Sequence, residues 1–320
     1  MPAQVIDAGT GDAVPLKKLA VAIAVLVSLC AVAVAQGVVV QEFSYQVKDV
    51  KTDGRYTVVF NSRSYDPTGG IPDELNELYQ RLPKGATVPK AFRKAKYYCQ
   101  AKKLVDKVRL EKGSGRFTPY LENLLKGKKK EPRNAKNNVD VCRFARIGKG
   151  RVLVDARPFE ERPIPADLQL FWTKPAPGAV AAFAIIGIPD ERFPVVRDNP
   201  TVRETVPTLT ANFYSEPTPN GLYDYKLVLP SGPVNGIRVS VAEVNVTVTG
   251  LTLVRTTKKC TKRKRGKCVK RKTTTKRTFW FTEPTCPPTG VLSFESFFGY
   301  KDPAVQDQLK QVTVPCPKFR

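Results

Sequence analysis

The chain of 320 residues contains no histidine, a single methionine and two tryptophans. The absence of histidine removes the commonest general base and the commonest ligand of transition metals. Serine–histidine and cysteine–histidine mechanisms are therefore excluded, and we expect no bound metal and no cofactor. No P-loop and no G-x-S-x-G sequence occurs, and Gly148-Lys149-Gly150 precedes a predicted strand, the wrong order for a dinucleotide-binding loop.

Acidic residues are also scarce relative to basic ones. The chain has 29 Asp and Glu against 53 Lys and Arg, a formal net charge of +24. Such an excess favours anionic partners such as nucleic acid, acidic cell-wall polymers or anionic lipid surfaces. The alternative is that the basic surface only keeps the protein soluble.

The N-terminal residues have the pattern of an export signal. Lys17-Lys18 precede an apolar run over residues 19–35, which ends in Ala33-Val34-Ala35 before Gln36. A positive segment, an apolar segment and an A-x-A site together predict a cleaved signal peptide over residues 1–35. The alternative is an uncleaved anchor, because the run is at the short limit for spanning a bilayer. We expect contact with a membrane only in that second case.

Six cysteines remain once Cys30, which lies in the apolar run, is set aside. An even number in an exported chain predicts three disulfides, for which fifteen pairings exist. Zinc ligation by the last four cysteines is the alternative, but their spacing lacks the paired C-x-x-C of zinc ribbons. Nearest neighbours would close self-contained segments, so we predict the pairs Cys99–Cys142, Cys260–Cys268 and Cys286–Cys316.

Most of the chain has the short alternating runs typical of β-strands. A hairpin is predicted within 37–60 around Asp53-Gly54, and another around Asn220-Gly221. The run 237–248 changes its apolar phase, which predicts a bulge near Ala242–Glu243. Further strands are predicted at residues 151–154, 168–173, 180–188, 251–254, 278–282 and 291–298.

Two short helices are predicted. Leu75, Leu78, Tyr79 and Leu82 have helical spacing before Pro83. A second helix is predicted over residues 119–126, with Thr118 as its N-cap, Pro119 at its first position and Gly127 after its end.

These elements predict a mainly β protein: one or two antiparallel β-sandwiches with one or two short helices, stapled by disulfides. We expect an N-terminal β-rich domain over residues 36–160 that holds the two helices, and a C-terminal sandwich over residues 166–320. The proline-rich segment 160–166 is either a linker between them or a loop within one domain.

The most unusual segment is residues 255–277, which hold thirteen Lys or Arg and no acid. Strand-like residues flank it, so it predicts a hairpin whose tip is closed by Cys260–Cys268. Such a hairpin would bind a polyanion. The alternative is a solvated loop whose lysines prevent aggregation. Trp280 is the one candidate stacking platform. The predicted polyanion-binding residues are Lys258, Lys259, Lys262, Arg263, Lys264, Arg265, Lys267, Lys270, Arg271 and Lys272.

A second basic stretch occupies residues 126–136 and falls inside the predicted Cys99–Cys142 loop. The sequence does not show whether it shares a face with the hairpin.

Without histidine, a hydrolase of the glycosidase type would need two facing carboxylates. None of the available acids has a distinctive context, so we expect that the protein is not an enzyme. The candidates are Glu160, Glu161, Asp190, Glu191, Glu243 and Glu295.

Several motifs resemble those of exported proteins of high-GC Gram-positive soil bacteria, a group with no assigned activity. They are LPKGATVPKAF from Leu82, CRFARIGKGRVLV from Cys142, FTEPTCPPTGVLSFESFFGY after the basic hairpin, and the closing PCP at 315–317. The resemblance implies an extracellular β-sandwich and carries no site residues over to this chain.

The sequence thus predicts a secreted or cell-envelope protein without enzymatic activity. We expect it to bind an anionic cell-wall polymer or another extracellular polyanion through the basic hairpin, and we expect no intracellular nucleic acid as partner. The alternatives are a secreted carboxylate-dependent hydrolase and an inert structural β-sandwich module.

Overall fold

The computed structural model describes residues 39–48, 57–86, 90–112, 117–127, 129–133, 136–155, 157, 161–198, 206–231, 240–249, 252–279 and 286–316. The predicted signal peptide, Cys30 and the Asp53-Gly54 turn lie outside these residues. Residues 38–320 form one compact unit.

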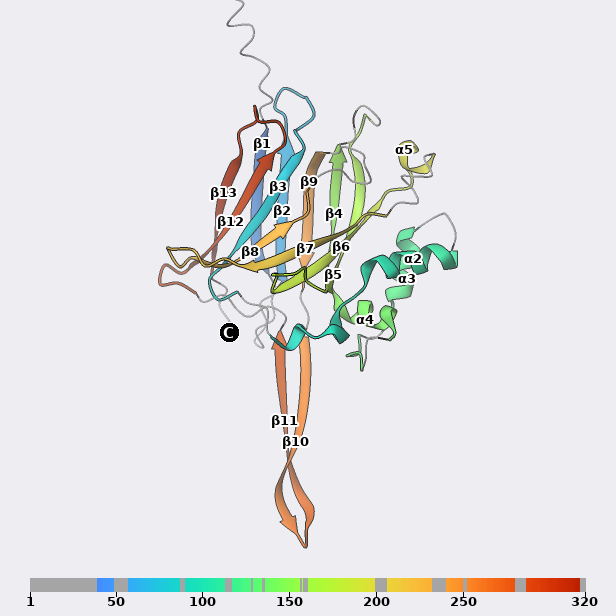
Figure 1. Cartoon of the computed structure of the whole chain (residues 1–320), viewed down its shortest axis with the longest axis vertical. Coiled ribbons are helices and arrows are strands. Elements are labelled where there is room, and N and C mark those ends of the chain that lie inside the picture. Colours follow the sequence, from blue (N-terminus) through green and yellow to red (C-terminus); the bar gives the residue numbers. More distant parts are fainter. Residues whose placement is uncertain are drawn as a thin grey trace, which may run out of the picture. The chain divides into compact units, whose positions relative to one another are not determined.

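Eleven strands of the described residues form a single antiparallel sheet (Figure 1). In spatial order they are β1 (Val40–Lys48), β2 (Thr57–Tyr65), β9 (Ser240–Val248), β4 (Arg146–Asp155), β5 (Ile164–Thr173), β6 (Ala181–Pro189), β7 (Thr208–Ser215), β8 (Tyr223–Leu229), β3 (Leu75–Pro83), β12 (Val291–Tyr300) and β13 (Gln308–Pro315). A separate two-stranded sheet consists of β10 (Thr252–Lys264) and β11 (Lys267–Phe279).

The large sheet curves until its two ends nearly meet. The Tyr45 ring of β1 stacks on Phe294 of β12 with 4.1 Å between ring centroids, and its hydroxyl donates to Gln80 Oε1 of β3 at 2.6 Å. Gln308 Nε2 of β13 donates to the carbonyl of Val39, next to β1, at 2.6 Å. Buried side chains therefore fill the inside of a nearly closed barrel.

The mainly β, antiparallel prediction is confirmed, whereas the sandwich prediction is not: the sheet is a nearly closed barrel. The difference arises from pairings between strands distant in sequence. Strand β9 lies between β2 and β4, and β3 lies between β8 and β12, so all eleven strands join one sheet. Sandwiches and barrels share the same inward–outward alternation, so the sequence pattern does not separate them.

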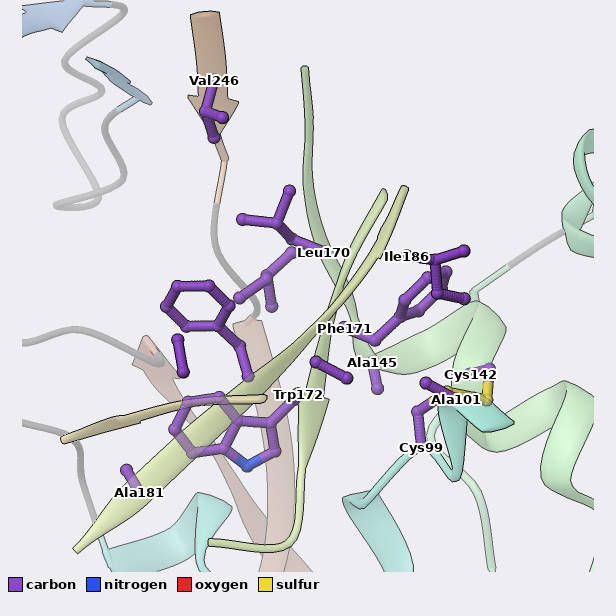
Figure 2. Close-up of a cluster of buried hydrophobic side chains, with 14 of the residues drawn as sticks. Cys99, Ala101, Cys142, Ala145, Leu170, Phe171, Trp172, Ala181, Ile186 and Val246 are labelled. Atoms are coloured by element: carbon purple, nitrogen blue, oxygen red, sulfur yellow. A yellow bond between two sulfur atoms is a disulfide. The ribbon is translucent and has the colours of Figure 1, made fainter. Parts of the chain in front are cut away.

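Helices cover part of the outer face of the barrel. They are α2 (Ala101–Lys112), α3 (Phe117–Leu125) and α4 (Asn138–Ala145), where α4 contacts β5 and α2 contacts β6. Figure 2 shows Phe171 and Ile186 on the helix side of the sheet, near Ala145, while Leu170 lies on the other side, towards Val246. The end of β5 is thus buried on both faces, which explains its apolar run Leu170-Phe171-Trp172.

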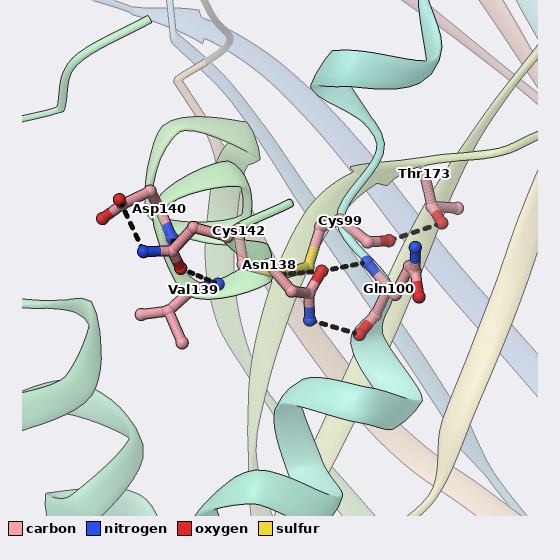
Figure 3. The surroundings of a disulfide bond; sticks show 8 residues. Cys99, Gln100, Asn138, Val139, Asp140, Cys142 and Thr173 are labelled. Atoms are coloured by element: carbon pink, nitrogen blue, oxygen red, sulfur yellow. Dashed lines mark hydrogen bonds between the residues drawn. A yellow bond between two sulfur atoms is a disulfide. The ribbon is translucent and has the colours of Figure 1, made fainter. Parts of the chain in front are cut away.

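A buried disulfide attaches these helices to the sheet. Cys99 and Cys142 are fully buried, and their Cα atoms are 4.5 Å apart. Around them, the Asn138 side chain exchanges two hydrogen bonds with the Gln100 backbone at 3.0 and 3.1 Å (Figure 3). Thr173 Oγ1 of β5 donates to the Cys99 carbonyl at 2.8 Å. The disulfide therefore joins the start of α2, helix α4 and the end of β5.

The helix predicted from Leu75 to Leu82 is wrong, because this segment is strand β3. Its neighbours β8 and β12 satisfy its backbone on both edges. Gln80 and Leu82 are buried, so the segment also fits a period of two. Tertiary pairing decided between a helical period and a strand period, both of which Leu78 and Leu82 satisfy.

A helix is present where the second one was predicted, as α3, but its predicted start is wrong. It begins at Phe117, so Thr118 is inside it rather than its N-cap, and Pro119 is its third residue. Gly127 follows it at φ +118°, the left-handed region that favours glycine. Helices α2 and α4 were not predicted. For α2 the signal was present, since Ala101, Leu104, Val105 and Val108 have helical spacing and are all buried.

The strand predictions largely hold. Strands β7 and β8 form the hairpin predicted around Asn220-Gly221, and Gly221 has φ +64°. The bulge in β9 is confirmed: Leu153 lies opposite Glu243 and Val154 opposite Val241, which leaves Ala242 extra. Strand β5 begins within segment 160–166, at Ile164, and pairs with β4. The short elements are η1 (Lys90–Phe92), η2 (Ala95–Tyr97) and α5 (Pro194–Arg197).

Candidate functional site

The candidate site is the two-stranded ribbon of β10 and β11, drawn as two long orange strands in Figure 1. Its strands are joined by Arg265-Gly266, with φ +46° and +75°. Positive φ at both central residues is the feature of a type I′ turn, whose twist suits a tight hairpin. The glycine adopts this conformation readily, whereas a non-glycine residue seldom does. The predicted hairpin is therefore present, with a two-residue turn at its tip.

The side chains of the ribbon face solvent. Every side chain from Thr256 to Lys276 is exposed except those of Cys260 and Cys268, which are half-buried and bonded to each other. All ten predicted polyanion-binding residues lie in this stretch. They are thus brought together on one exposed element of secondary structure, and none contributes to the core of the barrel.

The strand register places cations directly opposite one another. Lys259 lies opposite Lys272, and Lys262 lies opposite Lys270. Lys264 lies opposite Lys267 next to the turn. Like charges in directly opposed positions destabilise an antiparallel pair. The isolated ribbon therefore carries a repulsion that an anion placed between the strands' side chains would relieve.

Arg255 and Lys276 form a further opposed pair in the register, and sequence reasoning left both out of the predicted site. A signal was available in the turn. If Arg265-Gly266 is taken as a two-residue turn, counting outward along the two strands places residue 255 opposite residue 276. The register agrees with this count.

Other features hold the ribbon together despite this repulsion. The disulfide Cys260–Cys268 closes its tip. Threonines occupy the middle of both strands, where Thr257 Oγ1 donates to the Thr274 carbonyl at 3.3 Å. Threonine is a good strand former because it is β-branched. The ribbon is thus built to stay extended with its cations exposed.

Within the described residues, no cation of the ribbon is paired with an acidic side chain, whereas several cations of the barrel and helices are. Residues 252–279 contain no Asp or Glu, and the ion pairs among the described residues all lie outside the ribbon. By contrast, Arg146 donates twice to the Glu122 carboxylate, at 3.1 and 2.6 Å. Arg157 binds Asp155 and two loop carbonyls. Only on the ribbon is positive charge both concentrated and uncompensated within the described part of the chain.

The second basic stretch (126–136) makes contacts within the protein itself. Lys126 Nζ donates to Asn123 Oδ1 at 2.7 Å, and Lys129 Nζ donates to the Arg146 carbonyl at 2.9 Å. Glu131, in the middle of the stretch, pairs with Lys96 at 2.9 Å. These bonds attach the stretch to the helical region, so it is less available to a partner than the ribbon is.

Two of the carboxylates considered for a hydrolase, Glu295 and Asp190, are held by arginines. Glu295 of β12 binds Arg81 of β3, and Arg81 also donates to Glu216 at 3.0 Å. Asp190 accepts from Arg192 at 2.6 Å, and this bond lowers the pKa of the Asp190 carboxyl. A carboxyl with a lowered pKa is poorly suited to act as a general acid.

The remaining candidate acids lie elsewhere. Glu243 lies on β9 opposite Arg63, and Glu160 falls outside the described residues. Trp280, the candidate stacking platform of the ribbon, also falls outside them. Gly148 and Gly150 of the G-x-G sequence lie within β4, where they let the backbone of β9 approach closely. Their role is thus structural.

The described residues contain no group of three or more cysteines and carboxylates that could hold a metal ion. No helix among them is both long enough and apolar enough to cross a membrane. Comparisons with protein-family models, with curated proteins and with solved structures find no match to this chain.

Proposed function

We propose that this protein is an exported, non-enzymatic protein of the cell envelope or the extracellular space that binds anionic polymers through the basic ribbon. The observation that carries the proposal is the ribbon itself, whose thirteen Lys and Arg in residues 255–277 have no acidic residue among them. The ribbon cations whose side chains the structure describes are exposed, and they form no ion pairs with described carboxylates.

The charge arrangement supports a polymeric partner. A polyanion releases its condensed counterions when cations neutralise it, and this release favours binding in proportion to the number of contacts. Four opposed pairs along the ribbon, such as Lys259 and Lys272, each offer two cations. The bound polymer also reduces the repulsion between the opposed cations. Counterion release and reduced repulsion therefore both strengthen binding with each further pair that the polymer contacts.

The disulfides support the location. All three predicted pairs are present: Cys99–Cys142, Cys260–Cys268 and Cys286–Cys316. Three disulfides are consistent with an oxidising, extracytoplasmic environment, because cytosolic thiols are kept reduced. Together with the export pattern of residues 1–35, they favour an extracellular polymer over intracellular nucleic acid as the partner.

The test is binding of residues 36–320, which include the whole compact unit, to isolated cell wall across a salt series. A tip variant, in which the five Lys and Arg between Cys260 and Cys268 are changed to Gln, is measured alongside. We expect binding to weaken steeply as salt rises, and the tip variant to bind more weakly with a shallower salt dependence. Binding that is unaffected by salt and by the five substitutions would contradict the proposal and leave the charge a role in solubility.

A further inference from the structure

The two faces of the ribbon differ in composition. Opposed residues in an antiparallel pair share a face, and successive residues alternate between faces. The register has two bulges near the tip, which leave Thr261 extra on β10 and Val269 extra on β11. Because each strand has one extra residue, the opposed pairs on both sides of the bulges still alternate between the two faces of the ribbon. The disulfide agrees with this reading, since it requires Cys260 and Cys268 on the same face.

This assignment places three opposed lysine pairs on one face and Arg263 and Arg271 on the other. One face, here named the lysine face, carries three consecutive opposed pairs: Lys259 with Lys272, Lys262 with Lys270, and Lys264 with Lys267. The opposite face, here named the disulfide face, carries Cys260–Cys268. Its cations include Lys258, with Arg271 opposite Cys260 and Arg263 opposite Cys268.

The lysine face forms a double row of charge. Successive lysines are two or three residues apart along each strand, or about 7–10 Å, and opposed side chains begin about 5 Å apart. The lysines of the two strands therefore follow the ribbon axis in two columns. Lysine is a rotatable point charge without the planar, two-pronged geometry of arginine. Such a face responds to the charge and spacing of a ligand more than to the shape of each anionic group.

We propose, on the basis of the function proposed above, that the lysine face binds a linear phosphodiester polymer lying lengthwise between the two lysine columns. Phosphate is a usual partner of lysine acting as a point charge, whereas planar carboxylates favour the arginine fork. Successive phosphates along such a chain then meet successive lysine pairs.

Two features favour a linear chain over a flat anionic membrane. Figure 1 shows the two strands crossing as they approach the tip, so the ribbon twists strongly. A twisted face turns away from a plane, whereas a flexible chain follows it. The tip itself is Arg265-Gly266, and Val269 is the one large apolar residue between residues 255 and 277. Apart from that valine, the ribbon offers nothing for insertion into lipid.

The experiment compares two variants that remove equal charge at neighbouring levels of the ribbon. The first, K262Q/K270Q/K272Q, changes the lysine face, and the second, K258Q/R263Q/R271Q, changes the disulfide face. Linear poly(glycerol phosphate) is the probe. Mass spectrometry should show an intact Cys260–Cys268 bond in both variants, which verifies that the tip of the ribbon is closed in each. We expect the first variant to bind about tenfold more weakly, with a salt slope smaller by about 2, and the second to change less than about threefold.

Equal losses in the two variants would overturn the assignment to one face while leaving polyanion binding intact. Stronger binding to poly-glutamate, or to vesicles of anionic lipid, than to poly(glycerol phosphate) would overturn the assignment to a phosphodiester chain. Absence of binding by the unsubstituted protein to all three probes at low salt would instead refute the proposed function itself.

Discussion

Cys260 and Cys268 are bonded to each other but do not lie opposite each other in the strand register. Cys260 is opposite Arg271, and Cys268 is opposite Arg263. The disulfide therefore spans the two bulges diagonally and holds them in place. It fixes which side chains share a face, so it controls the arrangement of the cations as well as the closure of the tip.

Removing this disulfide is expected to loosen the ribbon without affecting the barrel. In the chain-entropy model, a loop of this length contributes about 2–3 kcal/mol. The variant C260S/C268S should show faster hydrogen exchange along β10 and β11 and weaker polyanion binding. Its urea midpoint, measured by tryptophan fluorescence, should match that of the unsubstituted protein, because the side chains from Thr256 to Lys276 lie outside the core. A large fall in that midpoint would show that the ribbon stabilises the barrel.

The disulfide Cys99–Cys142 should behave in the opposite way. Both cysteines are fully buried, and the bond attaches α4 to the end of β5. The variant C99A/C142A should lower the free energy of unfolding by about 4 kcal/mol, measured by urea titration. In a titration with reductant followed by alkylation, Cys99 and Cys142 should also be the last cysteines labelled, because reagents cannot reach them in the folded state. Early labelling of either one would contradict their burial.

The hydroxyl of Tyr45 offers a test of barrel closure. Y45F removes its hydrogen bond to the buried Gln80 and should lower the free energy of unfolding by about 1–2 kcal/mol at pH 7. Burial raises the pKa of Tyr45 well above its ordinary value, so the unfolded chain ionises first, above about pH 10. The stability contributed by this hydroxyl is therefore fully present below pH 10 and is lost as the pH rises further. The difference between the two proteins should shrink above pH 10, and a constant difference would refute the assignment.

Gly150 is expected to be intolerant of any side chain. A Cβ at this position would lie 2.9 Å from the Cα of Val246 and still closer to the carbonyl oxygen of Asn245, both of which belong to the backbone of β9. G150A should therefore destabilise the barrel by about 1–3 kcal/mol in urea unfolding. Gly187 is the matched control, since its Cβ would approach only the Pro207 side chain, at 3.4 Å, and the Leu168 side chain, at 3.8 Å. Equal tolerance of the two substitutions would contradict the close approach of β4 and β9.

The candidate site was more predictable than the fold around it. The ribbon depends on local signals: a type I′ turn, β-branched residues and two nearby cysteines, all within residues 252–279. The pairing of all six cysteines in sequence order also proved correct. The features of the ribbon involve residues close along the chain, so composition and spacing specify them.

The sequence by itself determined the β class, the bulge at Ala242 and the basic hairpin, because each depends on neighbours in the chain. The tertiary structure alone decided that segment 75–83 is a strand, because β8 and β12 lie on its two edges. It also decided that the sheet nearly closes into a barrel, and which lysines of the ribbon share a face. The first two outcomes depend on strands that are far away in the sequence, and the third depends on bulges that shift the register of the ribbon. None of them produces a distinctive spacing of residue types in the sequence.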